Sequence, residues 1–96
     1  VKDVCDAYFC AAESSPGGVF NICSGRETTV GDVVRTMLAI AGSTLAPEWG
    51  SVAPRSYDNK TRWVGDGRKA RELLSFEPKY NLEDGLKETY EWFKSI

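Results

Sequence analysis

The sequence contains no histidine, and this absence limits the chemistry open to the chain. Histidine is the side chain that most often serves as a general base near neutral pH. A serine hydrolase triad in its usual form therefore cannot be assembled from these residues. Cysteine is also scarce, because Cys5, Cys10 and Cys23 are an odd number without C-x-x-C spacing. We interpret them as small apolar side chains and expect neither a disulfide framework nor a metal site.

Long apolar runs and an excess of positive charge are missing as well. No run approaches the length of a membrane span, and no signal peptide is recognisable. The 96 residues carry 12 Lys and Arg against 14 Asp and Glu, whereas nucleic-acid binding needs a basic face. We therefore expect a cytoplasmic protein with no nucleic-acid partner and no membrane partner. Its length fits a single domain, or a fragment of one, over residues 1–96.

Apolar residues at helical spacing predict two helices in the first half of the chain. The first lies within residues 1–14 and begins at Lys2 or Asp3. The helix is amphipathic, and its apolar face consists of Val1, Val4, Cys5, Tyr8 and Ala12. In the second helix, Thr29 and Asp32 have the spacing of a capping box, and Gly42 ends the helix.

Two further helices are predicted in the second half. Asp66 is placed to cap a helix over 67–74, and Asn81 is placed to cap the last helix. The inward residues of the third helix are Ala70, Leu73 and Leu74. The apolar stripe of the last helix consists of Leu82, Leu86, Tyr90 and Phe93.

Short strands are predicted between the helices. The run "VFNIC" (19–23) is apolar and β-branched, which indicates a buried strand whose Asn21 amide needs a hydrogen-bond partner. Residues 45–50 can form an edge strand only, because they contain Pro47. Residues 61–64 alternate like another short strand. The fold class expected is α/β, a small mixed domain of about four helices and two or three short strands. These strands are too few for a complete sheet.

Positive charge is concentrated in "PRSYDNKTRWVGDGRKA" (54–70). This stretch contains Arg55, Lys60, Arg62, Arg68 and Lys69 against Asp58 and Asp66. A cationic loop that leads into a helix suits a phosphate ligand, but a solvated surface has the same composition. The residues by themselves leave both interpretations open.

Six short motifs in fixed order resemble one family. They are "DV…A", "GGVFNICSG", "TTVGDVV", "PRSYD", "VGDGRKARELLSFEP" and "LEDGLKETYEWF", and they run from Val1 to about Phe93. The order resembles the C-terminal portion of the extended short-chain dehydrogenase/reductases, the NAD-dependent nucleotide-sugar epimerases and dehydratases. Where that family usually has Leu-Gly-Trp, this chain has Leu-Ser-Phe. Ser75 must then adopt a backbone geometry that glycine adopts more easily, and Phe76 must fill an apolar notch.

The resemblance implies a role for the cationic stretch. Arg55 of "PRSYD" is similar to the arginine that reaches the ligand's diphosphate, and Asp58 to the acid near the ribose hydroxyls. Arg62 is either a second cation of the site or an outward surface residue. Arg68 and Lys69 are interpreted as surface residues. The substrate-binding residues expected are therefore Arg55, Asp58 and Arg62.

The resemblance also implies that NAD(P) binds in the parent family, through a glycine-rich turn of a Rossmann half. Nothing in this chain matches that turn, so we expect no cofactor on this chain alone. The family's catalytic Tyr-x-x-x-Lys spacing occurs once, as Tyr90 and Lys94. We interpret this pair as a core tyrosine and a lysine that suits the end of a helix, so no catalytic residue is predicted.

Two functions from different classes follow. The chain is expected to be the nucleotide-sugar-binding portion of an epimerase or dehydratase, not catalytically competent alone, with a Rossmann-domain partner. The alternative is a stand-alone interaction module that forms a homodimer or larger oligomer without ligand or catalysis.

Overall fold

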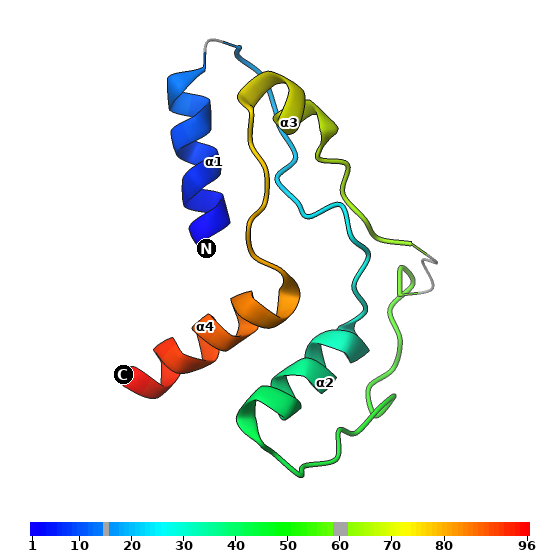
Figure 1. Cartoon of the computed structure of the whole chain (residues 1–96). Helices are drawn as coiled ribbons and strands as arrows, with labels where there is room; N and C mark the ends of the chain where they lie inside the picture. The colour runs from blue at the N-terminus through cyan, green and yellow to red at the C-terminus, as the bar shows by residue number, and fades with distance from the viewer. Residues whose placement is uncertain (15, 59–61) are drawn as a thin grey trace. The chain divides into compact units, whose positions relative to one another are not determined.

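The computed structural model describes residues 1–14, 16–58 and 62–96, and in this part of the chain all regular structure is helical (Figure 1). The elements are α1 (Lys2–Glu13), α2 (Val30–Ala41), α3 (Arg68–Leu74) and α4 (Leu82–Ser95). All four helices were predicted. None of them is long and apolar enough to cross a membrane, as far as the described residues go.

The predicted strands are wrong for the residues that the structure describes. Residues 19–23, 45–50 and 62–64 have no strand assignment, and Thr61 lies outside the described residues. Asn21 is exposed to solvent, so its amide does not need a protein partner. A strand exists only when a neighbouring strand accepts and donates its backbone hydrogen bonds, and composition alone cannot supply that neighbour.

The chain divides into two compact units. The first unit comprises Val1–Arg26 and Val64–Asn81, with α1 and α3. The second comprises Glu27–Trp63 and Leu82–Ile96, with α2 and α4.

The core of the first unit is small. Its buried residues are Ala7 of α1, Ala70 and Leu74 of α3, and Phe76 just after α3, while Cys10 and Phe20 pack against them from the side. Phe76 is 4% exposed, which confirms that it fills an apolar notch. Leu73 was predicted to point inward, but it is exposed.

Helix α1 turns an unexpected side toward this core. The apolar face of this helix, formed by Val1, Val4, Cys5, Tyr8 and Ala12, is exposed. The half-buried side instead carries Asp3 and Asp6 around the buried Ala7. Both carboxylates have partners there: Asp3 accepts backbone N–H groups of residues 79 and 80, and Asp6 pairs with Lys79 at 3.3 Å.

Two contacts hold the extended segment 17–24 within the first unit. Lys69 Nζ donates a hydrogen bond to the Val19 carbonyl at 2.9 Å and lies 4.8 Å from the centre of the Phe20 ring. Lys69 was predicted as a surface residue, and it is exposed. On the other side of the segment, Gly65 and Gly67 lie against Cys23, and Gly65 is so close that a Cβ there would stand 2.8 Å from the Cys23 sulfur.

Local signals set the ends of α3. The Asp66 carboxylate accepts the backbone N–H of Arg68 at 3.0 Å, one residue before the cap position at Gly67. The helix ends at Ser75, which has φ 55° and ψ 30° in the left-handed region. This confirms that Ser75 adopts a geometry that favours glycine.

In the second unit, α2 and α4 pack against each other. The capping box at the start of α2 is confirmed: Thr29 and Asp32 exchange side-chain and backbone hydrogen bonds of 3.0 and 3.1 Å. Gly42 ends α2 in the left-handed conformation, with Ser43 N–H bonded to the Leu38 carbonyl at 3.0 Å.

Only part of the apolar stripe predicted for α4 is shielded from solvent. Leu86 and Tyr90, in the middle of the helix, are half-buried, whereas Leu82 and Phe93 are exposed near its two ends. The packing against α2 therefore uses the central turns of α4.

Candidate functional site

The motif "PRSYD" forms a tight turn that brings Arg55 and Asp58 together. The backbone N–H of Asp58 donates to the Arg55 carbonyl at 3.0 Å, which closes the turn. The Asp58 carboxylate in return accepts the backbone N–H of Arg55 at 2.7 Å. It also accepts from the Arg55 side chain, with Nε at 3.2 Å and Nη2 at 3.1 Å from Oδ1.

Tyr57 is the third member of this turn, and the sequence analysis missed it. The Arg55 guanidinium carbon lies 4.7 Å from the centre of the Tyr57 ring. A guanidinium at this distance from an aromatic face is attracted by the ring's quadrupole. The available signal was the aromatic residue two positions after the arginine, but only the turn shows that the two side chains meet.

Charge and exposure define what the turn can do. The hydrogen bonds from the backbone and then the side chain of Arg55 lower the pKa of Asp58. The Arg55 side chain is 67% exposed, so the pair is open to solvent and contributes little to stability. Because Asp58 engages Nε and Nη2, the outer part of the guanidinium is accessible to an anion.

The third predicted binding residue, Arg62, has a different partner. Its Nε lies 3.4 Å from a carboxylate oxygen of Glu27, and its side chain is 74% exposed. No contact of the described residues joins Arg62 to Arg55 or Asp58. Lys60, which completes the cationic stretch, lies outside the described residues.

The remaining basic residues of the stretch hold local structure. Arg68 Nη2 bonds to Asp66 at 2.6 Å, and this side-chain bond is the main reason that the pKa of Asp66 falls to about 2. Lys69 reaches the Val19 carbonyl, as described above. The positive charge of residues 66–70 is therefore largely engaged within the first unit.

The pair with catalytic spacing lies in the second half of α4. Lys94 Nζ is 5.4 Å from the centre of the Tyr90 ring and 3.4 Å from a carboxylate oxygen of Glu91. The Tyr90 ring is half-buried. The lysine lies over the face of the ring.

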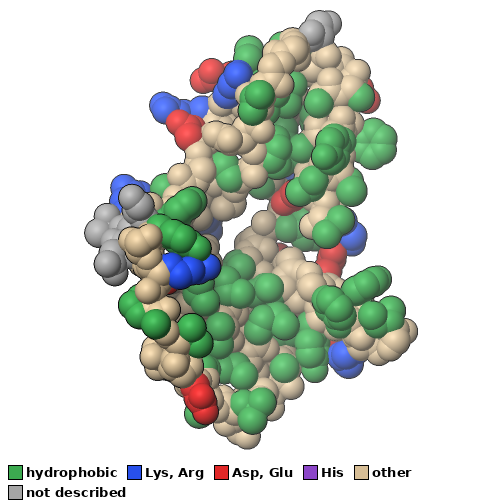
Figure 2. All heavy atoms as spheres, turned by 180° about the vertical axis from the view of Figure 1, so that it is seen from behind, with side chains coloured by type: hydrophobic (Ala, Val, Ile, Leu, Met, Phe, Trp, Pro, Cys, Tyr) green, Lys and Arg blue, Asp and Glu red, His purple; other side chains and the backbone are tan. Residues whose placement is uncertain are grey.

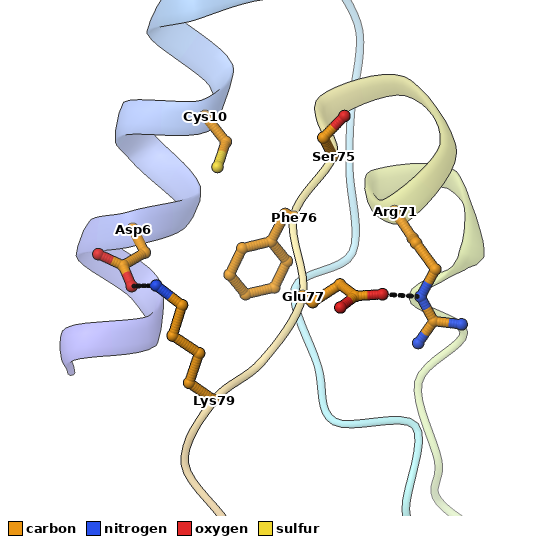
Figure 3. Close-up of a pocket in the computed structure, with 7 residues that line it drawn as sticks. All are labelled: Asp6, Cys10, Arg71, Ser75, Phe76, Glu77 and Lys79. Carbon is orange, nitrogen blue, oxygen red and sulfur yellow. Dashed lines mark hydrogen bonds and ion pairs between the residues drawn. The ribbon is translucent and has the colours of Figure 1, made fainter.

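A hollow of about 410 Å³ in the first unit was not predicted (Figure 3). The Phe76 ring lies between two ion pairs, Asp6 with Lys79 at 3.3 Å and Arg71 with Glu77 at 3.5 Å. Cys10 and Ser75 complete the lining. Each charged side chain around this hollow has an opposite charge beside it, so the hollow has no excess charge to attract an ion.

Cys5, Cys10 and Cys23 are free thiols. Among the described residues, no group of three or more His, Cys, Asp or Glu side chains is arranged to hold a metal ion.

Comparison with known proteins gives relatives along the full length of the chain, although no family model matches. The UDP-glucose 4-epimerase of Mycolicibacterium smegmatis is 33% identical over 96 residues, which are 99% of this chain and 30% of that protein. The UDP-glucose 4-epimerase of Halalkalibacterium halodurans is 27% identical over 98% of this chain and 29% of its own length.

Solved structures of one enzyme are also similar to this chain. The Bordetella bronchiseptica enzyme WbmF, determined in complex with NADH and in complex with NAD⁺ and UDP, is 35% identical to this chain. The superposition has a TM-score of 0.76 and covers 97% of this chain, but only 27–28% of WbmF.

The chain therefore has the sequence and fold of the C-terminal portion of the NAD-dependent epimerase/dehydratase family, the extended short-chain dehydrogenase/reductases. It spans about 30% of the length of the curated relatives that it matches. The family resemblance carried by the six sequence motifs is confirmed.

Proposed function

We propose that this chain is the nucleotide-sugar-binding portion of an NAD-dependent epimerase/dehydratase and is not catalytically competent alone. In this proposal Arg55 binds the diphosphate, Asp58 lies near the ribose hydroxyls, and Arg62 supplies a second cation. The observation that carries the proposal is the exposed guanidinium of Arg55, which is positioned by Asp58 on one edge and Tyr57 on one face.

The chemistry of the turn suits a diphosphate. A planar guanidinium makes paired, charge-assisted hydrogen bonds to phosphate oxygens, which a lysine ammonium cannot reproduce. Asp58 pre-orders Arg55, so less side-chain entropy is lost when a ligand binds. A carboxylate has lone pairs beyond those used here, so Asp58 can keep Arg55 and still accept a hydroxyl of the sugar.

The comparisons support the same ligand class. WbmF has been determined with UDP bound, and two relatives are named for their action on UDP-glucose. The family's cofactor fingerprint is missing from this sequence, which favours a chain that needs a further portion for the reaction.

Calorimetry with UDP-, GDP-, CDP- and dTDP-sugars tests the proposal. We expect binding of at least one of them, weakened by about tenfold or more in Arg55→Ala and partly retained in Arg55→Lys. Arg35→Ala is the matched control, because Arg35 is as exposed as Arg55 and pairs with Asp32 on α2 at 2.9 Å. No heat with any of the four ligands contradicts the proposal, as does an equal loss in the Arg35 variant.

The alternative function, an interaction module that oligomerises without ligand, has one observation in its favour. Large apolar side chains are exposed on both units, including Tyr8, Phe9, Trp63 and Trp92. It predicts an oligomer whose size increases with concentration. Sedimentation that shows a stable monomer at micromolar concentration removes this alternative.

A further inference from the structure

We infer that Tyr57 is a positioning residue of the diphosphate site. Its ring holds the Arg55 guanidinium so that Asp58 occupies one edge and the opposite end stays open to a phosphoryl group. The inference rests on the proposed function, because it gives Tyr57 a role in the site formed by Arg55. Tyr57 acts through the arginine and does not itself contact the ligand.

The turn fixes the backbone that carries both side chains. The N–H of Asp58 donates to the Arg55 carbonyl at 3.0 Å, and the Asp58 carboxylate accepts the Arg55 backbone N–H at 2.7 Å. Arg55 and Tyr57 both belong to this closed turn, so the spacing of their backbones is set locally. The guanidinium carbon of Arg55 lies 4.7 Å from the centre of the Tyr57 ring.

A carboxylate can bind a guanidinium in two ways, and only one of them leaves room for a ligand at Arg55. The five N–H groups of a guanidinium lie in one plane. A side-on carboxylate uses Nε and Nη2, and an end-on carboxylate uses Nη1 and Nη2. The structure shows the side-on pair, with Nε at 3.2 Å and Nη2 at 3.1 Å from Asp58 Oδ1. The end of the guanidinium is then able to make a paired contact with a phosphoryl group.

The ion pair alone does not fix this arrangement. The side chains of Arg55 and Asp58 are 67% and 34% exposed, and exposed ion pairs contribute little free energy. A long side chain also loses rotamer entropy when it is held in a single geometry. The Tyr57 ring adds a second attraction, which acts on the delocalised charge of the guanidinium rather than on individual N–H groups. The two contacts together restrict the guanidinium more than either contact does alone.

The Tyr57 ring holds the guanidinium at the surface, because the ring itself is only partly covered. Tyr57 is 51% exposed, so its contact with Arg55 does not withdraw the cation from solvent. Figure 2 shows hydrophobic side chains next to Lys and Arg side chains on the surface of the molecule. A guanidinium that is ordered before the ligand arrives loses less entropy on binding, and the affinity is higher for that reason.

Calorimetry with UDP tests the inference on this chain. Tyr57→Leu should weaken UDP binding by about two- to fivefold, the equivalent of a cation–π contact at an exposed site. Tyr57→Phe should keep the wild-type affinity, because the ring remains and only the hydroxyl is lost. Tyr8→Leu is the matched control, since Tyr8 is an exposed tyrosine on α1 in the other unit, and we expect no change in affinity.

A double-variant cycle separates positioning from direct contact with the nucleotide. If the ring acts through the guanidinium, Tyr57→Leu should have no further effect on UDP affinity once Arg55→Ala is present. A ring that contacted the nucleotide itself would weaken binding by the same factor with and without the arginine.

A second measurement needs no nucleotide. The ring current of Tyr57 should shift the Cδ proton resonances of Arg55 upfield in the wild type and in Tyr57→Phe, and Tyr57→Leu should abolish this shift. No binding of UDP to the wild type would contradict the proposed function. Unshifted Arg55 resonances in the wild type would instead contradict the positioning by Tyr57, so the two failures are distinguishable.

Three further results would overturn the inference. One is an affinity of Tyr57→Leu for UDP equal to that of the Tyr8→Leu control. Another is a loss in Tyr57→Phe as large as in Tyr57→Leu, which would assign the effect to the hydroxyl. The third is an equal loss from Tyr57→Leu with and without Arg55, which would make the ring a direct ligand contact.

Discussion

Asp3 and Lys79 are 76 positions apart in the chain and are joined by a hydrogen bond of 3.0 Å, from the backbone N–H of Lys79 to the Asp3 carboxylate. The second carboxylate oxygen accepts the next backbone N–H, that of Tyr80, at 3.1 Å. The first turn of α1 is thereby attached to the segment that precedes α4. A carboxylate is suited to this task because it accepts two adjacent N–H groups at once.

This relationship gives the first prediction. Asp3→Ala should lower the free energy of unfolding by about 1–2 kcal/mol, because two backbone N–H groups lose a charged acceptor. Asp6→Ala is the control on the same helix, since Asp6 pairs only with an exposed ammonium group of Lys79 among the contacts described. Urea unfolding at neutral pH measures both. A larger effect at Asp6 than at Asp3 would contradict the role given to Asp3.

Gly65 provides a steric prediction. A Cβ at this position would lie 2.8 Å from the sulfur and 2.9 Å from the Cβ of Cys23, closer than atoms approach without displacement. Gly65→Ala should therefore destabilise the chain by about 1–3 kcal/mol, in the range of overpacking. Gly17→Ala is the control, because nothing lies within 4 Å of its added Cβ. Combining Cys23→Gly with Gly65→Ala should restore part of the lost stability. Thermal unfolding of the wild type, the two single variants at positions 23 and 65, and the double variant checks this.

Replacing Ser75 with glycine should make the chain more stable. Its φ of 55° is costly for a residue with a side chain and costs glycine nothing. Ser75→Gly should stabilise the chain by about 0.5–1 kcal/mol, despite the added freedom of glycine in the unfolded state. The control is Ser14→Gly, at the end of α1, where φ is −104° and the same change should destabilise. If Ser75→Gly and Ser14→Gly change the free energy of unfolding in the same direction, the backbone at Ser75 is not strained.

The capping box of α2 predicts a pH dependence. Hydrogen bonds from the Thr29 side chain and backbone, and then from Arg35, lower the pKa of Asp32 from 3.8 to about 2. Because the folded state has the lower pKa, the stabilising contribution of Asp32 is complete above pH 4 and is lost as pH falls from about 4 to 2.

The measurement is the unfolding midpoint of the wild type and of Asp32→Asn from pH 7 to pH 2. The wild type should be more stable at pH 7, and the difference should disappear near pH 2. Glu48→Gln, which alters a carboxylate between α2 and α3, is the control. A difference for Asp32→Asn that stays constant down to pH 2 would show that its carboxylate charge has no part in the cap.

The helix ends illustrate what sequence patterns can predict. Thr29, Asp32 and Gly42 act on backbone groups within a few residues of themselves, so their effect depends little on the rest of the fold. The same holds for Ser75, where the expected left-handed geometry is present. Strand predictions failed because a strand needs a distant partner, and residues 19–23 have none among the described residues.

At the candidate site, the resemblance assigned Arg55 to a diphosphate and Asp58 to ribose hydroxyls, and the pairing of these two side chains with each other was not predicted. Their contact is local, because a turn closed by the Asp58 N–H and the Arg55 carbonyl brings the two residues together. The contact of the Arg55 guanidinium with the Tyr57 ring was not predicted. Nor was the ion pair between Arg62 and Glu27. Their contacts depend on side-chain direction and on segments that are distant in the sequence.

The sequence by itself determined where the four helices lie, how α2 and α3 end, and which family the chain resembles. These depend on local hydrogen bonding and on the order of short motifs. Only the tertiary structure decided which side of α1 faces its own core. Apolar periodicity identifies a stripe that must be covered but not by what, and here the backbone at residues 79 and 80 drew the acidic side inward and left the apolar side exposed.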